Sequence, residues 1–259
     1  MVSNLFKLLR VKYFIVTLVS ISLFSSCLDG SKNQDNDAIV IREIADAATL
    51  NPVFSGDPVG ILAKSPPEQE IDSNGFLKLT FELREEAKFD DGSPILAEDV
   101  LFSIKANLCP AKEKIKNTAY YEFIQAFEIN AVNPRKFIII CKNAATRNQF
   151  VAGDFAILQK SKYDPEKILD DYSIQELQAI ESINGIDRLL NFANEFESNK
   201  YAFEPEFISG SGPYKLIQWE KGQFILLEKK SDWWGHSIKE NIFFKATAPK
   251  IRYEIISNP

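Results

Sequence analysis

Residues 77–100 read LKLTFELREEAKFDDGSPILAEDV and carry the clearest structural signal in the chain. Apolar residues alternate with polar ones in the first part, and this period of two predicts a strand with one buried face. The alternating residues are Leu77, Leu79, Phe81 and Leu83. A turn rich in Asp, Gly and Pro follows, and apolar residues then recur at helical spacing. The stretch therefore predicts a strand, a turn and a helix, with the helix at Ala97–Leu108.

The rest of the chain alternates between strand and helix patterns. A turn at 133–135 between two apolar runs predicts a β-hairpin. From 163 to 201 the pattern is helical, and Ser173 with Glu176 forms a capping box at one helix start. The other strand patterns cover residues 39–44, 123–131, 136–142, 214–220, 223–229 and 250–256. This order of elements predicts an α+β fold in which helices are inserted between hairpins.

Composition places the chain among globular proteins. It has 259 residues, of which 45% are hydrophobic and 12% aromatic, so it can bury a sizeable core and is not a disordered chain. Thirty Lys and Arg residues against 36 Asp and Glu residues give a net charge of -6. Because no basic block is long enough to neutralise a run of phosphates, we expect no nucleic-acid partner.

Residues 1–26 have the layout of an export signal peptide. Three basic residues precede an apolar run from 13 to 24, and the small residues Ser25 and Ser26 stand directly before Cys27. The apolar run is too short for a spanning helix, which needs about 20 residues. The run LFSSC that ends at Cys27 resembles the lipobox of bacterial lipoproteins, whose cysteine carries the lipid. The alternative is an ordinary signal followed by a chance cysteine.

Cleavage before Cys27 would leave a mature chain that starts with a polar, apolar-poor segment. Residues 27–38 therefore read as a flexible tether, and lipid on Cys27 would hold the protein on a membrane of the cell envelope, facing the periplasm or the exterior. The two other cysteines are Cys109 and Cys141. An oxidising compartment would permit a disulfide between them, and two half-buried thiols are the alternative.

The residues that common catalytic and metal sites require are missing. His236 is the single histidine, so a two-histidine zinc site cannot form, and no serine has the spacing of a nucleophile elbow. No phosphate-binding glycine loop is present. Adjacent acids such as Asp90 and Asp91 are typical of a solvated turn. We therefore expect a binding protein and no enzyme, with no catalytic residue, no metal site and no cofactor.

Two segments of the chain resemble one protein family. Residues 81–84 and 87–100 follow its pattern of a strand F-x-L-R, a turn F-x-D-G-T-P and a helix opening T-A-x-D-V. Residues 210–216 and 233–235 resemble its G-T-G-P-Y strand and its closing Y/W-W-G. Over residues 39–259 the chain resembles the family 5 extracellular solute-binding proteins of ABC importers, a group that includes oligopeptide, dipeptide and nickel binders.

The resemblance implies a membrane-tethered receptor that hands a peptide-like solute to an ABC permease. The implied architecture is one lobe of a two-lobed periplasmic-binding-protein type II-like fold, at residues 39–259, with an inserted subdomain at 69–162. Members of the family are about twice as long, so the resemblance covers only an N-terminal half and the chain looks truncated at Pro259. The alternative function is a truncated surface lipoprotein that does not transport and has a structural or interaction role.

The resemblance also indicates which residues could line a ligand cleft. Ser55 lies in a loop after a Leu-Asn-Pro turn, and Tyr120 and Tyr121 lie after the first helix. The alternative for these three is a turn serine and two core aromatics. In the two family segments, Gly92 and Gly212 are expected to adopt positive φ in tight turns, so these segments are expected to build the scaffold and not to contact the ligand.

Overall fold

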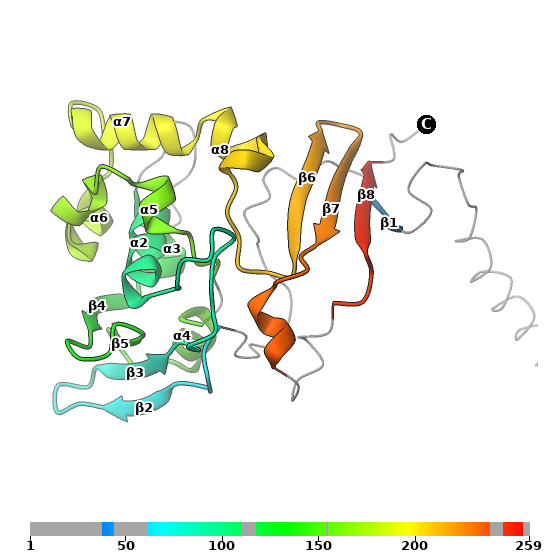
Figure 1. Ribbon diagram of the computed structural model, residues 1–259. Coiled ribbons are helices and arrows are strands. Elements are labelled where there is room, and N and C mark those ends of the chain that lie inside the picture. Colours follow the sequence, from blue (N-terminus) through cyan, green and yellow to red (C-terminus); the bar gives the residue numbers. More distant parts are fainter. Residues whose placement is uncertain (1–37, 44–61, 110–117, 154, 239–245, 256–259) are drawn as a thin grey trace, which may run out of the picture. The chain divides into compact units, whose positions relative to one another are not determined.

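The computed structural model describes residues 38–43, 62–109, 118–153, 155–238 and 246–255 (Figure 1). The expected signal peptide, Cys27, all but the last residue of the expected tether, and Ser55 lie outside these residues. In the described part of the chain, no helix has the length and apolar character needed to cross a membrane.

The first of two sheets has four antiparallel strands. Its β3 (Leu77–Glu82) is the predicted alternating strand, and Leu77, Leu79 and Phe81 are buried as expected. The predicted hairpin is also confirmed, and it contributes the other central strand. Leu79 pairs with Ile139 in the middle of the sheet, and both side chains are fully buried. The strand order is β2-β3-β5-β4, with β2 at Glu68–Ile71, β4 at Ile124–Ile129 and β5 at Lys136–Cys141.

Helix α2 (Ala97–Leu108) has the predicted bounds. At its start, the Leu96 N–H donates to the carboxylate of Asp99 (N···Oδ2 2.9 Å), and the Lys160 N–H donates to the other oxygen (N···Oδ1 3.0 Å). Burial raises the pKa of Asp99, although both hydrogen bonds act to lower it. Asp99 therefore satisfies a backbone group at the start of α2 and joins this helix to the start of α5 (Lys160–Tyr163).

A series of short helices follows the hairpin, and α5, η2 (Ile168–Asp171) and α6 (Ile174–Ala179) of this series contact α2. The predicted capping box is confirmed, because the Glu176 N–H donates to Ser173 Oγ (3.1 Å) and the Ser173 N–H donates to Glu176 Oε2 (2.7 Å). This box begins α6 (Ile174–Ala179), which contacts both α2 and β4. The other helices of the series are α4 (Thr146–Val151), α7 (Asp187–Phe196), α8 (Asn199–Phe203) and η3 (Pro205–Phe207). Helix α3 (Thr118–Tyr121) precedes the hairpin and contacts α2.

The second sheet brings together strands from opposite ends of the described chain. Its order is β1-β8-β7-β6, with β1 at Ala38–Glu43, β6 at Tyr214–Glu220, β7 at Phe224–Lys229 and β8 at Lys250–Ile255. Strands β1 and β8 are neighbours (Figure 1) and pair in parallel, whereas β6 and β7 form the predicted hairpin. The hairpin turns at Gly222, whose φ is 74°. The short helix η4 (Trp234–Ser237) lies between β7 and β8.

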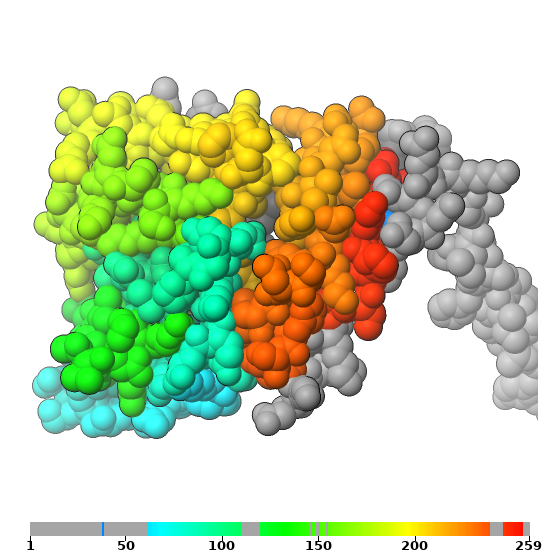
Figure 2. Space-filling view, viewed as in Figure 1, coloured from blue at the N-terminus to red at the C-terminus, as the bar shows by residue number. Residues whose placement is uncertain are grey.

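The main hydrophobic core joins the first sheet to the helices. It also includes Trp233 and Trp234, which follow the second sheet's strand β7. In Figure 2 the orange atoms of this segment lie against the blue-green atoms near α2. Leu177 and Leu189 are fully buried in the same core, although both lie outside the 69–162 interval expected for an inserted subdomain. The bounds of that subdomain remain a prediction.

The structure also tests what the sequence predicted for two glycines and two cysteines. Gly92 has a φ of 82°, as predicted, but the prediction for Gly212 is wrong because its φ is not in the left-handed region. A residue that precedes proline favours an extended backbone, and Pro213 follows Gly212. Cys109 and Cys141 are both buried and are not joined to each other by a disulfide, which agrees with the alternative.

Candidate functional site

Tyr120 and Tyr121 share helix α3 but lie in different surroundings. Tyr121 is 5% exposed, and its ring packs edge-on against Phe155 at a centroid separation of 6.0 Å. Its carbonyl accepts a hydrogen bond from Gln178 Nε2 (3.2 Å), a side chain of α6. Tyr120 is 39% exposed, and its ring rests edge-on against Tyr121 at 5.5 Å. Tyr120 is therefore the one of the two that can meet a solute, while Tyr121 supports it from the core.

The role of these tyrosines as ligand contacts remains a prediction. The packing of Tyr121 favours the alternative of a core aromatic, and its most direct effect on a ligand would be to hold Tyr120 in place. Ser55 lies outside the described residues, so the structure does not bring it together with the tyrosines. Of the three expected cleft residues, Tyr120 is the one with a described and accessible side chain.

The turn between β3 and α2 carries contacts that the sequence did not indicate. Asp91 holds the turn itself, because the Ser93 N–H and Oγ donate to its Oδ1 at 2.9 and 2.6 Å, and its Oδ2 accepts from Gln159 Nε2 (2.5 Å) just before α5. Asp90 reaches a different distant segment. Its Oδ2 accepts from the Gly210 N–H (2.9 Å), 120 positions away, and its Oδ1 pairs with Lys230 Nζ. The two family-like segments therefore meet through Asp90, which the sequence pattern of adjacent acids assigned to solvent.

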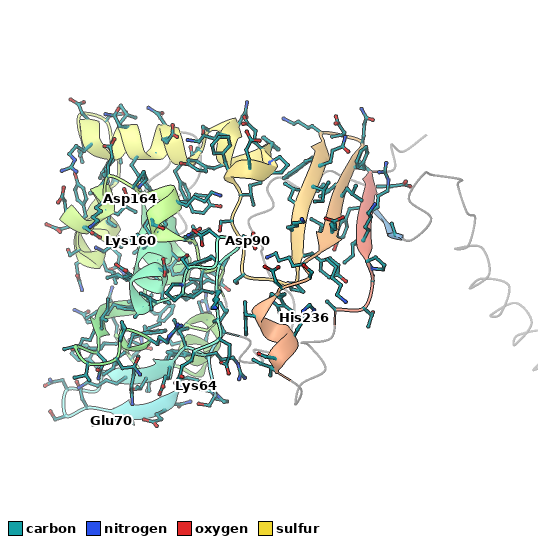
Figure 3. All side chains as sticks on the ribbon, viewed as in Figure 1. Lys64, Glu70, Asp90, Lys160, Asp164 and His236 are labelled. Carbon is teal, nitrogen blue, oxygen red and sulfur yellow. The ribbon has the colours of Figure 1, made fainter. Side chains whose placement is uncertain are left out.

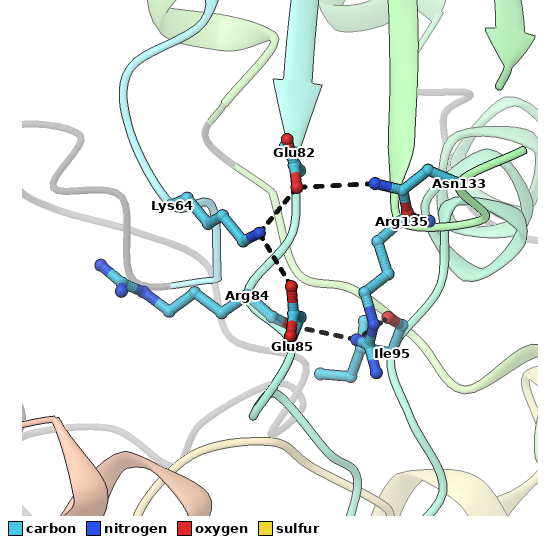
Figure 4. Close-up of polar contacts among 7 residues, drawn as sticks. All are labelled: Lys64, Glu82, Arg84, Glu85, Ile95, Asn133 and Arg135. Atoms are coloured by element: carbon cyan, nitrogen blue, oxygen red, sulfur yellow. Dashed lines mark hydrogen bonds and ion pairs between the residues drawn. The ribbon is translucent and has the colours of Figure 1, made fainter.

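A second polar cluster holds the β4–β5 turn against the end of β3 (Figure 4). Arg135 Nη1 donates to the carbonyl oxygens of Arg84 (3.0 Å) and Ile95 (2.9 Å). Lys64 Nζ lies 2.7 Å from Glu82 Oε1 and 3.3 Å from Glu85 Oε1. Hydrogen bonds to these carboxylates raise the pKa of Lys64. All these contacts join one backbone segment to another, so this cluster serves the scaffold.

The single histidine and the buried thiol of Cys141 have surroundings that the structure defines. The His236 ring packs edge-on against Trp233 at a centroid separation of 5.5 Å. In the part of the chain that the structure covers, no group of three or more His, Cys, Asp or Glu side chains is placed to hold a metal ion. Burial raises the pKa of Cys141 to about 11, so this thiol is a poor nucleophile.

Comparison with known proteins decides the family. Residues 57–259 match the family described as bacterial extracellular solute-binding proteins, family 5. This chain belongs to that family. The resemblance of the two sequence segments is thereby confirmed, and the family is one of solute binders.

Relatives and solved structures of this family share only part of their length with the chain. It is 27% identical over 166 residues to the probable peptide-binding protein YejA of Agrobacterium fabrum, covering 64% of this chain and 22% of that protein. It is 22% identical to the oligopeptide-binding protein AppA of Bacillus subtilis, covering 88% of this chain and 42% of AppA. A crystal structure of the oligopeptide-binding protein of Thermus thermophilus, complexed with a pentapeptide, superposes with a TM-score of 0.60 at 20% identity, covering 86% of this chain and 42% of that one.

These likenesses establish the fold. The mixed α and β architecture is that of a partial lobe of the periplasmic peptide-binding fold. The chain spans less than half the length of the relatives it matches.

Proposed function

We propose that this chain supplies one lobe of a receptor that binds an oligopeptide or dipeptide and delivers it to an ABC permease. The observation that carries the proposal is the family match over residues 57–259. Relatives whose names state a ligand point to peptides, including AppA of Bacillus subtilis and the periplasmic oligopeptide-binding protein OppA of Salmonella typhimurium. The exposed ring of Tyr120 is compatible with the proposal, because an aromatic ring can pack against the apolar part of a peptide.

Tyr120 is the described side chain that the proposal places at the ligand. Its ring is held from behind by Tyr121, which in turn packs on Phe155. A ring supported in this way loses little conformational entropy when a ligand covers it, so the surface is well suited to binding.

The proposal is tested by ligand-dependent melting of the full chain with Cys27 changed to serine, in the presence of a pool of short peptides. A ligand at 100 times its dissociation constant stabilises a protein by about 2.7 kcal/mol, which for this chain length raises the melting midpoint by about 5–10 °C. A midpoint that no peptide shifts would exclude peptide binding by this chain.

Tyr120→Ala then tests the site, with Ile129→Ala as the matched control. Tyr120 and Ile129 are 39% and 42% exposed, so neither substitution opens a large internal cavity. We expect Tyr120→Ala to weaken peptide binding about 10-fold and Ile129→Ala to leave it unchanged. Equal affinities for the two variants and the parent would remove Tyr120 from the site.

Lipid attachment at Cys27 and delivery to a membrane permease complete the proposal. They rest on the basic, apolar and small-residue order of residues 1–26 and on the cysteine that follows it. The test is fractionation of bacterial cells that express the chain, with labelled palmitate. The parent chain should carry label and sediment with membranes, and Cys27→Ser should do neither. A Cys27→Ser chain that still carries label would contradict the assignment.

A further inference from the structure

The segment 208–213 links η3 to β6 and is held mainly by side chains from elsewhere in the chain. We call this segment the strap. The Ser209 N–H donates to Tyr163 Oη (3.3 Å), and the Gly210 N–H donates to Asp90 Oδ2 (2.9 Å). The Ser211 carbonyl accepts from the indole N–H groups of Trp233 and Trp234, each at 2.8 Å, and the Pro213 carbonyl accepts from the Lys230 N–H (2.9 Å). The backbone hydrogen bonds of the strap lie at its two ends, because the Ile208 N–H donates to the Pro205 carbonyl (3.3 Å) and the Pro213 bond extends the pairing of β6 with β7. In between, Ser209, Gly210 and Ser211 are held by side chains.

Asp90 is the point at which three segments meet. It lies in the turn between β3 and α2, receives the strap through Gly210, and pairs with Lys230, which follows β7. Figure 3 shows Asp90 at the side of the first sheet's helices that faces β6 and β7. The side chain of Lys230 is 10% exposed and that of Asp90 is 29% exposed, so water screens this pair only partly.

The strength of the strap's contacts is uneven. Within the described part of the chain, Asp90 is the one charged group that binds the strap's backbone, whereas the tyrosine and the two indoles are neutral. Hydrogen bonds to a charged group are about twice as strong as neutral ones. Ser209 Oγ is buried and has no hydrogen-bond partner among the residues that the structure describes, which weakens the closed position of the strap.

We propose that Asp90 is a latch and that the strap opens as a local unit, independently of the unfolding of either sheet. When the hydrogen bond from Gly210 to Asp90 and the ion pair of Asp90 with Lys230 break, the strap loses its charged partner. The remaining hydrogen bonds of 208–213, which involve neutral groups, then break together. Because the strap is one of the connections between the first sheet's helices and the second sheet, its opening acts as a hinge between them. This inference does not depend on whether the chain binds peptide.

Hydrogen exchange of the full chain, followed by mass spectrometry, tests the latch. The variants are Asp90→Asn and Asp90→Ala, and the control is Glu86→Gln, an exposed acid in the same segment. We expect the amides of 208–212 to exchange about 10- to 100-fold faster in Asp90→Ala, which is the effect of losing one hydrogen bond to a charged group. Asp90→Asn should be intermediate because it keeps an acceptor for Gly210. Amides of β3 and β5 should keep their protection in every variant.

Two results would overturn the proposal. One is unchanged exchange of the strap in Asp90→Ala; the other is acceleration of β3 and β5 by the same factor as the strap. If the Asp90 variants do not fold, exchange of the parent chain in increasing denaturant gives the answer. If the strap opens locally, the free energy of opening obtained from its amide exchange should depend little on denaturant concentration. If the strap and the two sheets instead show the same opening free energy and the same denaturant dependence, a separate opening unit is excluded.

Discussion

Ile139→Ala probes the centre of the first sheet, and Ile138→Ala, its neighbour on β5, is the matched control. Ile139 is fully buried opposite Leu79, whereas Ile138 is partly exposed on the other face of the same strand. The two substitutions remove the same atoms from the same strand, so the change in β propensity is shared. Their difference therefore measures burial alone.

The expected magnitudes follow from the atoms removed. Isoleucine to alanine deletes three carbons, and at about 0.8 kcal/mol for each the transfer contribution is about 2.4 kcal/mol. A cavity in a fully buried site adds to this, so Ile139→Ala should lower the free energy of unfolding by about 3–4 kcal/mol. Ile138→Ala leaves little cavity and loses only part of the transfer contribution, so it should cost about 1 kcal/mol.

Urea denaturation followed by far-UV circular dichroism measures both values. The slopes of the unfolding transitions should agree among the three proteins, since the same surface is exposed on unfolding. Equal costs for the two variants, or a larger cost for Ile138→Ala, would refute the assignment of the buried face of β5.

Three further predictions concern single side chains. In Gly235→Ala the added Cβ would overlap the buried ring of Trp233, so urea denaturation should show a loss of at least about 2 kcal/mol, and a neutral result would mean that the ring can move aside. Burial raises the pKa of Cys141 to about 11, so this thiol should resist alkylation at pH 8 until the protein is unfolded; rapid native labelling at that site by mass spectrometry would contradict this. Partial burial raises the pKa of Asp91, but hydrogen bonds from Ser93 outweigh it and hold the pKa below the ordinary 3.8. The stability that Asp91 contributes is therefore present above pH 3.8 and lost as the pH falls through the folded-state pKa. Below pH 4, the melting temperature of Asp91→Asn should therefore fall less steeply with pH than that of the parent protein.

Local patterns predicted most of the secondary structure. The alternation at Leu77–Glu82, the helix at Ala97–Leu108 and the capping box at Ser173 are each decided by residues close together in the chain, and all three are confirmed. The candidate site was predicted less completely. Sequence placed Tyr120 and Tyr121 after the first helix, but it could not tell the exposed ring from the buried one, because burial depends on Phe155 and Gln178.

The sequence by itself determined the elements, the family-like segments and the absence of a histidine pair or a nucleophile elbow. Tertiary structure decided which segments meet. Nothing local to β1 indicates a parallel partner at β8, and nothing local to Asp90 indicates Gly210. A turn pattern in the sequence predicts the backbone conformation of the turn, but it does not predict where the side chains of the turn point. A carboxylate in such a turn is solvated unless a distant donor arrives, and the arrival of that donor is a property of the whole fold.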